Sequence, residues 1–264
     1  MAIITLLSDF GLGSPYVASM KGVILSLHPG ATIVDLSHAV PPQDVRLGAV
    51  LWEDVAELFP AGTIHVGVVD PGVGTDRALV YARVGRQCFL CPDNGLLSRL
   101  ARKTPPSKVV RLTQRDYWRE PVSATFHGRD ILSPVAAHLS LGLDPDHLGI
   151  PHGPLVMLDW PAIRRADDRL EGSVLACDGF GNVITDLARD MFPPASLGPQ
   201  LRVACCGREV VGLSRVYGRS PRGALVALFG STDRLELAVV DGSAAALLAA
   251  APGDRVTVRW PATG

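Results

Sequence analysis

The chain has 264 residues, of which 47% are hydrophobic and 19% are charged, a composition that supports a large buried core and excludes a wholly disordered chain. Its formal net charge of −1 gives no general basic surface, so we expect neither nucleic acid nor an anionic membrane as a partner. The most apolar runs, such as residues 224–230 and 244–251, fall well short of the ~20 residues that a membrane-spanning helix requires.

The first 150 residues alternate apolar runs typical of buried strands with segments of helical periodicity. Residues 2–7 are expected to form a strand buried on both faces, not a signal peptide, because no basic segment precedes them and Asp9 follows early. Further strands are predicted at residues 31–36, 63–69, 79–84, 87–90 and 108–112, and helices at 15–27, 43–59, 95–103 and 130–143. This alternation predicts an α/β N-terminal domain with a central, mostly parallel sheet.

The remainder of the chain predicts a smaller, β-rich C-terminal domain. Short strands are expected at residues 169–177, 182–186, 201–205, 209–211, 224–229, 234–240 and 255–259, with one helix at 243–251. Prolines at positions 151, 154 and 161 punctuate the stretch before them. We therefore expect an N-terminal catalytic domain of residues 1–155, a linker of residues 156–167 and a C-terminal substrate-binding domain of residues 168–264.

The five cysteines are Cys88, Cys91, Cys177, Cys205 and Cys206. An odd number of cysteines does not suggest a disulfide framework and is compatible with a cytoplasmic location. Cys88 and Cys91 have the spacing of a metal or redox pair, but they lie in a strand-like run without a second pair of ligands. We interpret them as buried thiols and expect no metal site.

Four polar, glycine-rich loops follow predicted strands, at residues 8–11, 70–77, 92–95 and 125–130. Ligands of open α/β sheets bind outside the carboxyl ends of the strands, so these loops are candidates for a site. Each has a simpler explanation, since Asp9 could cap a helix, Arg77 could be a surface residue and His127 could lie in the core. The gathering of carboxylates, an arginine and a histidine at one edge nevertheless favours a ligand site.

The usual signatures of several enzyme classes are missing from the sequence. Gly11 and Gly13 do not complete G-x-G-x-x-G, because position 16 is Tyr16, and Walker A, H-E-x-x-H and G-x-S-x-G motifs do not occur. A Rossmann dehydrogenase, a P-loop nucleotidase, a zinc hydrolase and an α/β-hydrolase therefore all lack their typical patterns.

The segment 178–185, with the sequence Asp178-Gly-Phe-Gly-Asn-Val-Ile-Thr185, joins two predicted strands. It could be a plain hairpin turn or a loop that recognises a base, with an aromatic ring for stacking and the amide of Asn182 for the edge of adenine. The chain contains only two asparagines, Asn94 and Asn182, which modestly favours the functional interpretation.

Eight motifs follow one another along most of the chain. They are Thr5-Leu-Leu-Ser-Asp-Phe-Gly11, Tyr16-Val-Ala-Ser-Met-Lys-Gly22, Ile33-Val-Asp-Leu-Ser-His38, Val68-Val-Asp-Pro-Gly-Val-Gly74, Pro92-Asp-Asn-Gly95, Thr125-Phe-His-Gly-Arg-Asp130, residues 178–185 and Leu235-Glu-Leu-Ala238. Together they resemble the S-adenosylmethionine (SAM) hydrolases, or SAM hydroxide adenosyltransferases, whose relatives are the SAM-dependent fluorinase and chlorinase.

The resemblance implies a homotrimer that binds SAM between the N-terminal domain of one subunit and the C-terminal domain of a neighbour. It also implies a water-activating set formed by Asp70, Arg77 and His127. The halogenases have tyrosines where this sequence has Asp70 and His127, and this departure favours hydrolysis over halide transfer. No cofactor is implied, because SAM itself is the substrate.

The resemblance further assigns residues to substrate binding. Asp9 would hold the ribose hydroxyls, and Ser231 would contact the methionine end, next to Thr232, where the halogenases have arginine. Asp178 and Asn182 would contact substrate from the C-terminal domain, although this stretch has one residue fewer than in the halogenases. Val239 and Asp241 would offer backbone groups near adenine.

The expected reaction is hydrolysis of SAM to adenosine and L-methionine by attack of an activated water or hydroxide at ribose C5′. Arg77 can stabilise a hydroxide-like oxygen, and Asp70 or His127 can orient the water and take its proton. Two alternatives remain open: a SAM-dependent halogenase with chloride as nucleophile, and a non-catalytic protein that binds SAM or adenosine.

Overall fold

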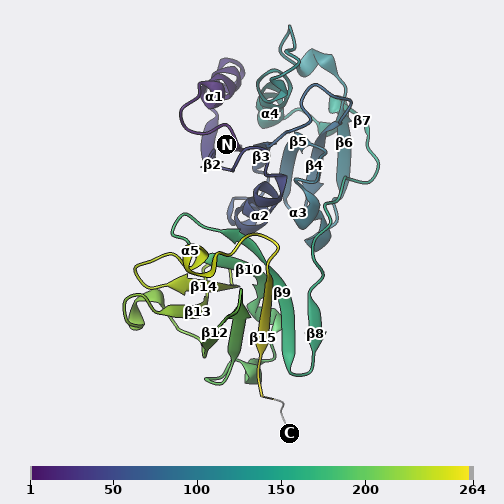
Figure 1. Cartoon of the computed structure of the whole chain (residues 1–264). Helices are drawn as coiled ribbons and strands as arrows, with labels where there is room; N and C mark the ends of the chain where they lie inside the picture. Colours follow the sequence, from purple (N-terminus) through teal and green to yellow (C-terminus); the bar gives the residue numbers. More distant parts are fainter. Residues whose placement is uncertain (1, 262–264) are drawn as a thin grey trace. The chain divides into compact units, whose positions relative to one another are not determined.

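The computed structural model describes residues 2–261, which form two compact units divided between Leu158 and Asp159 (Figure 1). Each unit has its own sheet and its own hydrophobic core.

The first unit is built on a seven-stranded mixed sheet with the order β2-β1-β3-β5-β4-β6-β7. Its strands are β1 (Ile3–Ser8), β2 (Thr32–Ser37), β3 (Ile64–Val68), β4 (Leu79–Val84), β5 (Gln87–Pro92), β6 (Lys108–Leu112) and β7 (Gly149–Pro151). Strands β2, β1, β3 and β5 are parallel, whereas β4, β6 and β7 pair antiparallel with their neighbours.

The expected mostly parallel sheet is therefore corrected to a mixed one. The cause is the two-residue connection between β4 and β5, formed by Gly85 and Arg86. So short a loop can join only antiparallel strands, because a parallel pair needs a crossover of a dozen or more residues. Gly85 has a φ of +56°, which a tight hairpin turn requires.

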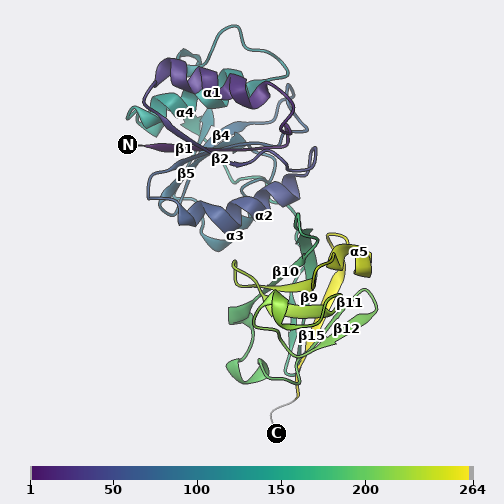
Figure 2. The ribbon, with the colours of Figure 1, turned by 90° about the vertical axis from the view of Figure 1, so that its left-hand side faces the viewer.

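Helices cover both faces of this sheet, as Figure 2 shows. Helices α1 (Tyr16–Leu27) and α4 (Ser133–Ser140) lie on one face, and α2 (Val45–Val55) and α3 (Ser98–Lys103) lie on the other. Successive side chains of a strand point to opposite faces, so Leu6 packs in the core under α1 and α4, and Leu7 packs in the core under α2 and α3. Burial on both faces explains the unbroken apolar run predicted as the first strand.

The predicted helix 130–143 is replaced by two consecutive elements. A π-helical turn spans Gly128–Leu132, and α4 continues from Ser133 with Pro134 in its first turn. Proline is tolerated there because the first N–H groups of a helix have no intrahelical acceptor. The predicted helix 43–59 is also shorter, since α2 ends at Val55 and a 3₁₀ turn follows over Ala56–Leu58.

The second unit is an antiparallel sheet with the order β12-β11-β15-β9-β10-β14-β13, with β8 paired to β9. Its elements are β8 (Arg164–Ala166), β9 (Arg169–Cys177), β10 (Val183–Ala188), β11 (Arg202–Cys205), β12 (Arg208–Val211), β13 (Leu225–Phe229), β14 (Arg234–Val239), α5 (Ala244–Leu248) and β15 (Arg255–Arg259). The end strands β12 and β13 also contact each other, so the sheet curls towards a barrel around its core. Strand β8 lies within residues 156–167, where we expected a linker.

None of the helices in residues 2–261 combines the length and the apolar character that crossing a bilayer demands.

Candidate active site

Three carboxylates of the first unit follow neighbouring parallel strands. Asp9 comes directly after β1, Asp70 comes two residues after β3 ends, and Asp93 directly follows β5. Because β1, β3 and β5 are parallel and adjacent, their carboxyl ends meet at one edge of the sheet. The loops singled out in the sequence therefore gather at this edge.

Asp70 and Arg77 form a buried ion pair within one loop. The Arg77 Nε lies 2.8 Å from both carboxylate oxygens of Asp70, and its Nη2 donates to Oδ2. The side chain of Arg77 is only 10% exposed and that of Asp70 only 6%, so water screens the pair weakly. Arg77 is thus held in place and is not the solvated surface residue that the simpler explanation assumed.

His127 reaches the same guanidinium from another part of the chain. Its Nδ1 lies 2.9 Å from Arg77 Nη2, which can only donate, so Nδ1 accepts and the proton of the neutral ring is on Nε2. Burial lowers the pKa of His127, and the positive charge of Arg77 lowers it further, against the smaller opposing effects of Asp70 and Asp130. The imidazole is therefore neutral at neutral pH.

The backbone around His127 is held by two close packings. Gly128 packs against Val68 and Met20 so closely that a Cβ would lie 3.1–3.3 Å from their side chains. Gly74, with a φ of +82°, lies so near the backbone oxygen of Ala124 that a Cβ would be 2.5 Å from it. These contacts hold the loop that contains Arg77 against the segment that precedes His127.

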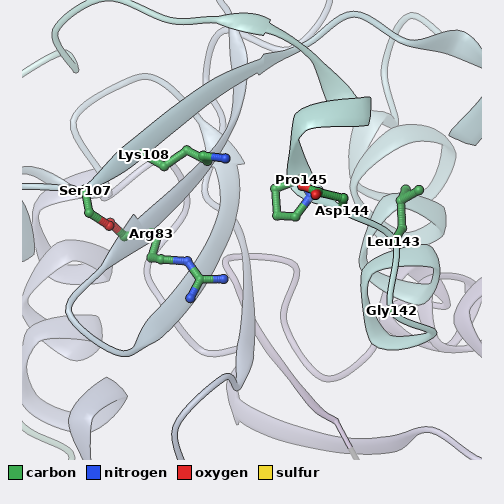
Figure 3. Close-up of a pocket in the computed structure, with 7 residues that line it drawn as sticks. All are labelled: Arg83, Ser107, Lys108, Gly142, Leu143, Asp144 and Pro145. Atoms are coloured by element: carbon green, nitrogen blue, oxygen red, sulfur yellow. The ribbon is translucent and has the colours of Figure 1, made fainter.

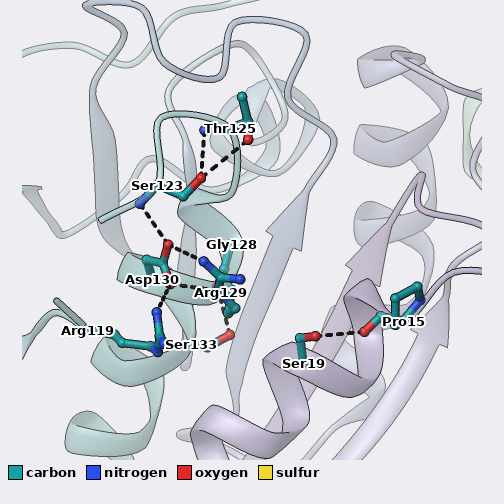
Figure 4. A network of polar contacts seen from close by, with 9 residues as sticks. All are labelled: Pro15, Ser19, Arg119, Ser123, Thr125, Gly128, Arg129, Asp130 and Ser133. Atoms are coloured by element: carbon teal, nitrogen blue, oxygen red, sulfur yellow. Dashed lines mark hydrogen bonds and ion pairs between the residues drawn. The ribbon is translucent and has the colours of Figure 1, made fainter. Parts of the chain in front are cut away.

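Asp130 lies at the centre of a group of polar contacts close to His127 in the sequence, and Figure 4 shows these contacts. Its side chain is fully buried and accepts hydrogen bonds from Arg129, from Arg119 Nη1 at 3.1 Å and from the backbone N–H of Ser123 at 2.9 Å. The Arg129–Asp130 part of the predicted motif is therefore scaffolding, whereas His127 points to Arg77.

Asp9 accepts a hydrogen bond at Oδ2 from the backbone N–H of Gln43, at 2.8 Å. It does not cap α1, whose N-cap is Pro15 and has no side-chain cap, so the capping explanation is wrong. An aromatic cluster lies beside the Asp9 and His127 positions, because the rings of Phe10 and Phe126 have centroids 5.7 Å apart and both contact Tyr16.

Asp93 and Asn94 support the loops instead of facing the Asp70–Arg77 pair. Asp93 contacts His152 Nε2 at 2.9 Å and accepts from the N–H of Val156 at 2.8 Å. The amide of Asn94 donates to the carbonyl of Val69 at 2.8 Å, which fixes the backbone just before Asp70. This motif therefore positions the site, an assignment that its turn-like sequence could not give.

In the second unit, Asp178 and Asn182 close the hairpin between β9 and β10. Asn182 donates from its amide to Asp178 Oδ2 at 2.8 Å, and the N–H groups of Phe180 and Asn182 donate to Oδ1. Phe180 at the tip is 83% exposed. The turn explanation holds, and it leaves the side-chain amide oxygen (Oδ1) of Asn182 and the Phe180 ring for other contacts.

The other residues predicted to bind substrate lie on two further loops of this unit. Val239 ends β14, and Asp241 is exposed with a φ of +54°. Gly181 packs against Ser243, the N-cap of α5, and accepts from Ala245, so these residues and the Asp178 hairpin lie side by side.

Ser231 is exposed in the turn between β13 and β14. The buried Glu236, opposite Ile184 in the ladder, accepts from Tyr217 at 2.8 Å. Burial raises the pKa of Tyr217 to about 12, with Glu236 and then Asp178 adding to the shift. Sequence reasoning missed this pair, because no motif connects residues 19 positions apart.

A separate pocket of about 470 Å³ in the first unit does not belong to this site (Figure 3). Its lining includes Arg83 at the end of β4 and Lys108 at the start of β6. Both residues lie at the edge where β5 begins, opposite the carboxyl ends that carry Asp70.

The cysteines expected to be buried thiols, Cys88 and Cys91, are 7% and 0% exposed on β5. Within residues 2–261, no group of three or more His, Cys, Asp or Glu side chains is arranged to hold a metal ion.

Comparisons with known proteins agree with this architecture. The chain matches the SAM hydroxide adenosyltransferase N-terminal domain over residues 4–149 and the corresponding C-terminal domain over residues 172–257. A solved structure from Thermotoga maritima, described as an uncharacterized conserved protein, superposes with a TM-score of 0.93 at 32% identity, covering 97% of this chain and 100% of that one.

Curated relatives give the same result. The (R)-S-adenosyl-L-methionine hydrolase of Thermus thermophilus is 42% identical over 90% of this chain and 92% of its own length, and that of Salinispora arenicola is 40% identical over 97% of both. A fluorinase of Nocardia brasiliensis is more distant, at 28% identity over 89% of both chains. The chain therefore belongs to the SAM hydroxide adenosyltransferase family.

Proposed function

We propose that this protein hydrolyses SAM to adenosine and L-methionine by attack of water at ribose C5′. The observation that carries the proposal is the arrangement of Arg77 between Asp70 and the neutral ring of His127, at the carboxyl edge of the sheet. The names of the relatives that are 38–42% identical support the same substrate and reaction.

The chemistry of SAM explains why such a set suffices. Attack at C5′ expels a neutral thioether from a sulfonium, so the leaving group needs no general acid. The difficulty lies with the nucleophile, since water is weak and hydroxide is scarce at neutral pH. Arg77 keeps its charge at any physiological pH and can stabilise a hydroxide-like oxygen beside its guanidinium.

The hydrogen bonds suggest separate roles for Asp70 and His127. Nδ1 of His127 is occupied by Arg77, so the ring offers its Nε2–H to the oxygen of water and orients it. Asp70 carries more lone pairs than Arg77 engages, so its carboxylate is the acceptor for the proton of the attacking water. We assign the positioning of water to His127 and its deprotonation to Asp70.

Substrate binding is assigned to residues of both units. Asp9 holds the ribose hydroxyls, because its Oδ2 is anchored by Gln43 and its Oδ1 has no hydrogen-bond partner within residues 2–261. In the second unit, binding of the methionine and adenine parts is assigned to Asp178, Asn182, Ser231, Val239 and Asp241. Asn182 would use its free amide carbonyl and second N–H, because one N–H already binds Asp178.

Three finer features belong to the same proposal. The relatives are named for the R form of SAM, so we propose that this chain acts on the R configuration at sulfur. We propose a homotrimer, as the family resemblance implies. We also propose a cytoplasmic location, because the five cysteines are free thiols, as expected of a reducing compartment.

Product analysis with each sulfur epimer of SAM, with and without chloride, tests the function. We expect adenosine and methionine in equal amounts from the R epimer, no effect of chloride, and a loss of at least about 100-fold in kcat for Asp70→Asn. A 5′-chlorinated nucleoside would show the halogenase, and binding without turnover would show a non-catalytic protein. Faster hydrolysis of the S epimer would contradict the assignment of configuration alone.

A further inference from the structure

A chain of polar side chains joins α1, β2 and the end of β1 next to the Asp9 position. Lys21 Nζ lies 2.6 Å from Asp35 Oδ2, and Asp35 Oδ1 lies 3.1 Å from His38 Nε2. Nδ1 of His38 lies 2.7 Å from the hydroxyl oxygen of Ser8. The proposed reaction uses none of these four residues.

A bulge in β2 brings His38 to Ser8. The register of the parallel pair β1–β2 shifts after Asp35, where β2 carries an extra residue, so that Leu7 lies opposite Ser37. One residue further along each segment, the side chain of Ser8 meets that of His38. Bulges commonly redirect a side chain beside a functional site, and an unbroken ladder would have placed Ser37 there instead.

The charge of Asp35 determines which ring nitrogen of His38 faces it with a proton. Burial raises the pKa of Asp35, but the hydrogen bond and charge of Lys21, together with the contact with His38, outweigh burial, so the pKa is lowered and the carboxylate stays ionised. The His38 Nε2–H therefore faces Asp35 as an electrostatic contact rather than an aligned hydrogen bond. Nδ1 then accepts, and the Ser8 hydroxyl donates to it.

Although serine, histidine and aspartate occur together here, they do not form a hydrolytic triad. Ser8 is 1% exposed and His38 is 6% exposed, so no substrate reaches the hydroxyl. The Ser8 hydroxyl oxygen also accepts a hydrogen bond from the backbone N–H of Phe10, with 3.4 Å between the oxygen and the nitrogen. The group therefore acts on the backbone that follows β1.

This backbone carries Asp9, and His38 binds it both before and after Asp9. The His38 ring binds Ser8 directly before Asp9, and the His38 carbonyl accepts from the N–H of Gly11 at 2.8 Å, two residues after it. Among the residues that the structure describes, the Asp9 carboxylate itself is bound only at Oδ2, by the N–H of Gln43. The direction of the free oxygen therefore depends on how firmly the turn is held.

We propose that His38 is a positioning residue for Asp9, acting through Ser8 and Gly11 to aim the Asp9 carboxylate at the ribose hydroxyls of the substrate. This inference rests on the proposed function, because it needs Asp9 to bind ribose. It predicts that losing the Ser8–His38 hydrogen bond weakens the recognition of the ribose hydroxyls and leaves the chemical step at C5′ largely intact.

The test compares two substitutions at one position. His38→Asn can keep a hydrogen-bonding atom near the place of Nδ1 and so retain the bond to Ser8, whereas His38→Gln reaches towards Asp35 and loses that bond. We expect KM for SAM to rise about tenfold in His38→Gln with kcat changed less than about threefold, and His38→Asn to recover most of the loss. His28→Gln is the control, because His28 also binds a serine, Ser140, at 2.8 Å, at the other end of α1.

A SAM analogue lacking both ribose hydroxyls separates positioning from general damage. The KM for this analogue should be the same in the parent, His38→Gln and Asp9→Ala proteins, because the contact that the turn positions no longer exists. A change that merely loosened the fold would raise KM for both substrates. Thermal unfolding of each variant checks that the protein remains folded.

The outcomes distinguish three claims: the proposed function, the role of Asp9 and the positioning role of His38. A parent protein that does not hydrolyse SAM contradicts the proposed function, and Asp9→Ala with an unchanged KM for SAM contradicts the role of Asp9. A marked effect of Asp9→Ala with none of His38→Gln overturns the positioning role of His38. An equal effect of His38→Gln on SAM and on the analogue overturns it as well.

Discussion

At the scale of single residues, the site depends on Arg77 binding two partners with one planar group. Its Nε and Nη2 engage Asp70, and Nη2 also reaches Nδ1 of His127. A guanidinium can do this because its donors point outward in a rigid fork, whereas an ammonium is a single point of charge. The contact spans 50 residues of sequence, so the loops singled out in the sequence contain the three residues but could not show that Arg77 joins them.

Arg77→Lys should therefore be far more damaging than conservation of charge suggests. We expect kcat to fall at least about 100-fold, because a lysine cannot hold Asp70 and His127 together while facing the water. Arg99→Lys is the matched control, since Arg99 forms a similarly buried ion pair with Glu53 between α3 and α2. Steady-state kinetics give kcat for both variants, and similar losses of kcat in the two would contradict the special role of Arg77.

The lowered pKa of His127 makes a prediction about pH. Protonation would remove the acceptor for Arg77 and add a second positive charge beside it, so activity should fall on the acid side at a pH below the ordinary histidine value of 6.5. The folded state holds this proton less tightly than the unfolded chain. Its contribution to stability is therefore complete above pH 6.5 and declines as the pH falls.

NMR titration of the ring protons of His127 measures this pKa directly, and kcat/KM against pH gives the functional counterpart. In His127→Asn, the amide oxygen can accept from Arg77 without titrating. The acid-side decline of the remaining kcat/KM that histidine protonation causes should therefore disappear. A midpoint above 6.5, or a limb that survives in His127→Asn at the same pH, would refute the neutral-imidazole account.

At the scale of elements, glycine contacts hold the site loops together. Gly74 allows the loop with Asp70 and Arg77 to touch the backbone of Ala124, and Gly128 lets the start of the π-helical turn pack on β3. Asn94 ties the loop after β5 to the end of β3. Sequence alone marked these positions as turns, but a close approach between segments 50 residues apart leaves no local pattern.

Gly74→Ala tests this packing, with Gly85→Ala as its control. Both glycines have positive φ angles, but a Cβ at Gly85 would meet open space, whereas one at Gly74 would lie 2.5 Å from the Ala124 oxygen. We expect Gly85→Ala to cost about 1–2 kcal/mol in urea unfolding, from the left-handed backbone alone. Gly74→Ala should cost more and should also lower kcat at least about tenfold, and equal effects would argue against the packing role.

Helices and strands with a long apolar pattern were predicted close to their bounds, whereas the relative direction of the strands was not predicted correctly. Strands β9 and β15 have the predicted bounds, and the covering helices of the first unit lie close to their predicted ranges. The apolar runs of β4 and β5 do not show strand direction, because burial on both faces produces the same pattern in either direction. The two residues between the predicted strands 79–84 and 87–90 already required an antiparallel pair, and the expectation of a mostly parallel sheet overlooked them. The three-residue strands β7 and β8 were missed, because three residues are too few for a period.

At the scale of the whole molecule, the assigned residues are divided between two compact units. Asp9, Asp70, Arg77 and His127 belong to the first, and Asp178 and Asn182 belong to the second. Composition and periodicity predicted two domains, one α/β and one β-rich. The homotrimer came only from the family resemblance and stays a prediction, because its interfaces involve other copies of the chain.

Mixing two inactive variants tests the trimer. If Asp9 of one subunit and Asn182 of its neighbour serve the same site, then Asp9→Ala and Asn182→Ala chains, unfolded and refolded together, should regain part of the parental activity. The expected recovery comes from sites that receive both intact residues. Absence of recovery in oligomers shown by mass spectrometry to be mixed would mean that each site lies within one chain.

The central claim is that water attacks C5′ of SAM, and the fate of labelled oxygen tests it most directly. The R epimer of SAM is incubated with the protein in water enriched in oxygen-18, and the adenosine is analysed by mass spectrometry with fragmentation. The account predicts one labelled oxygen, located on the 5′ carbon of the ribose, together with unlabelled methionine. Unlabelled adenosine, release of adenine, or label at any other atom would contradict it.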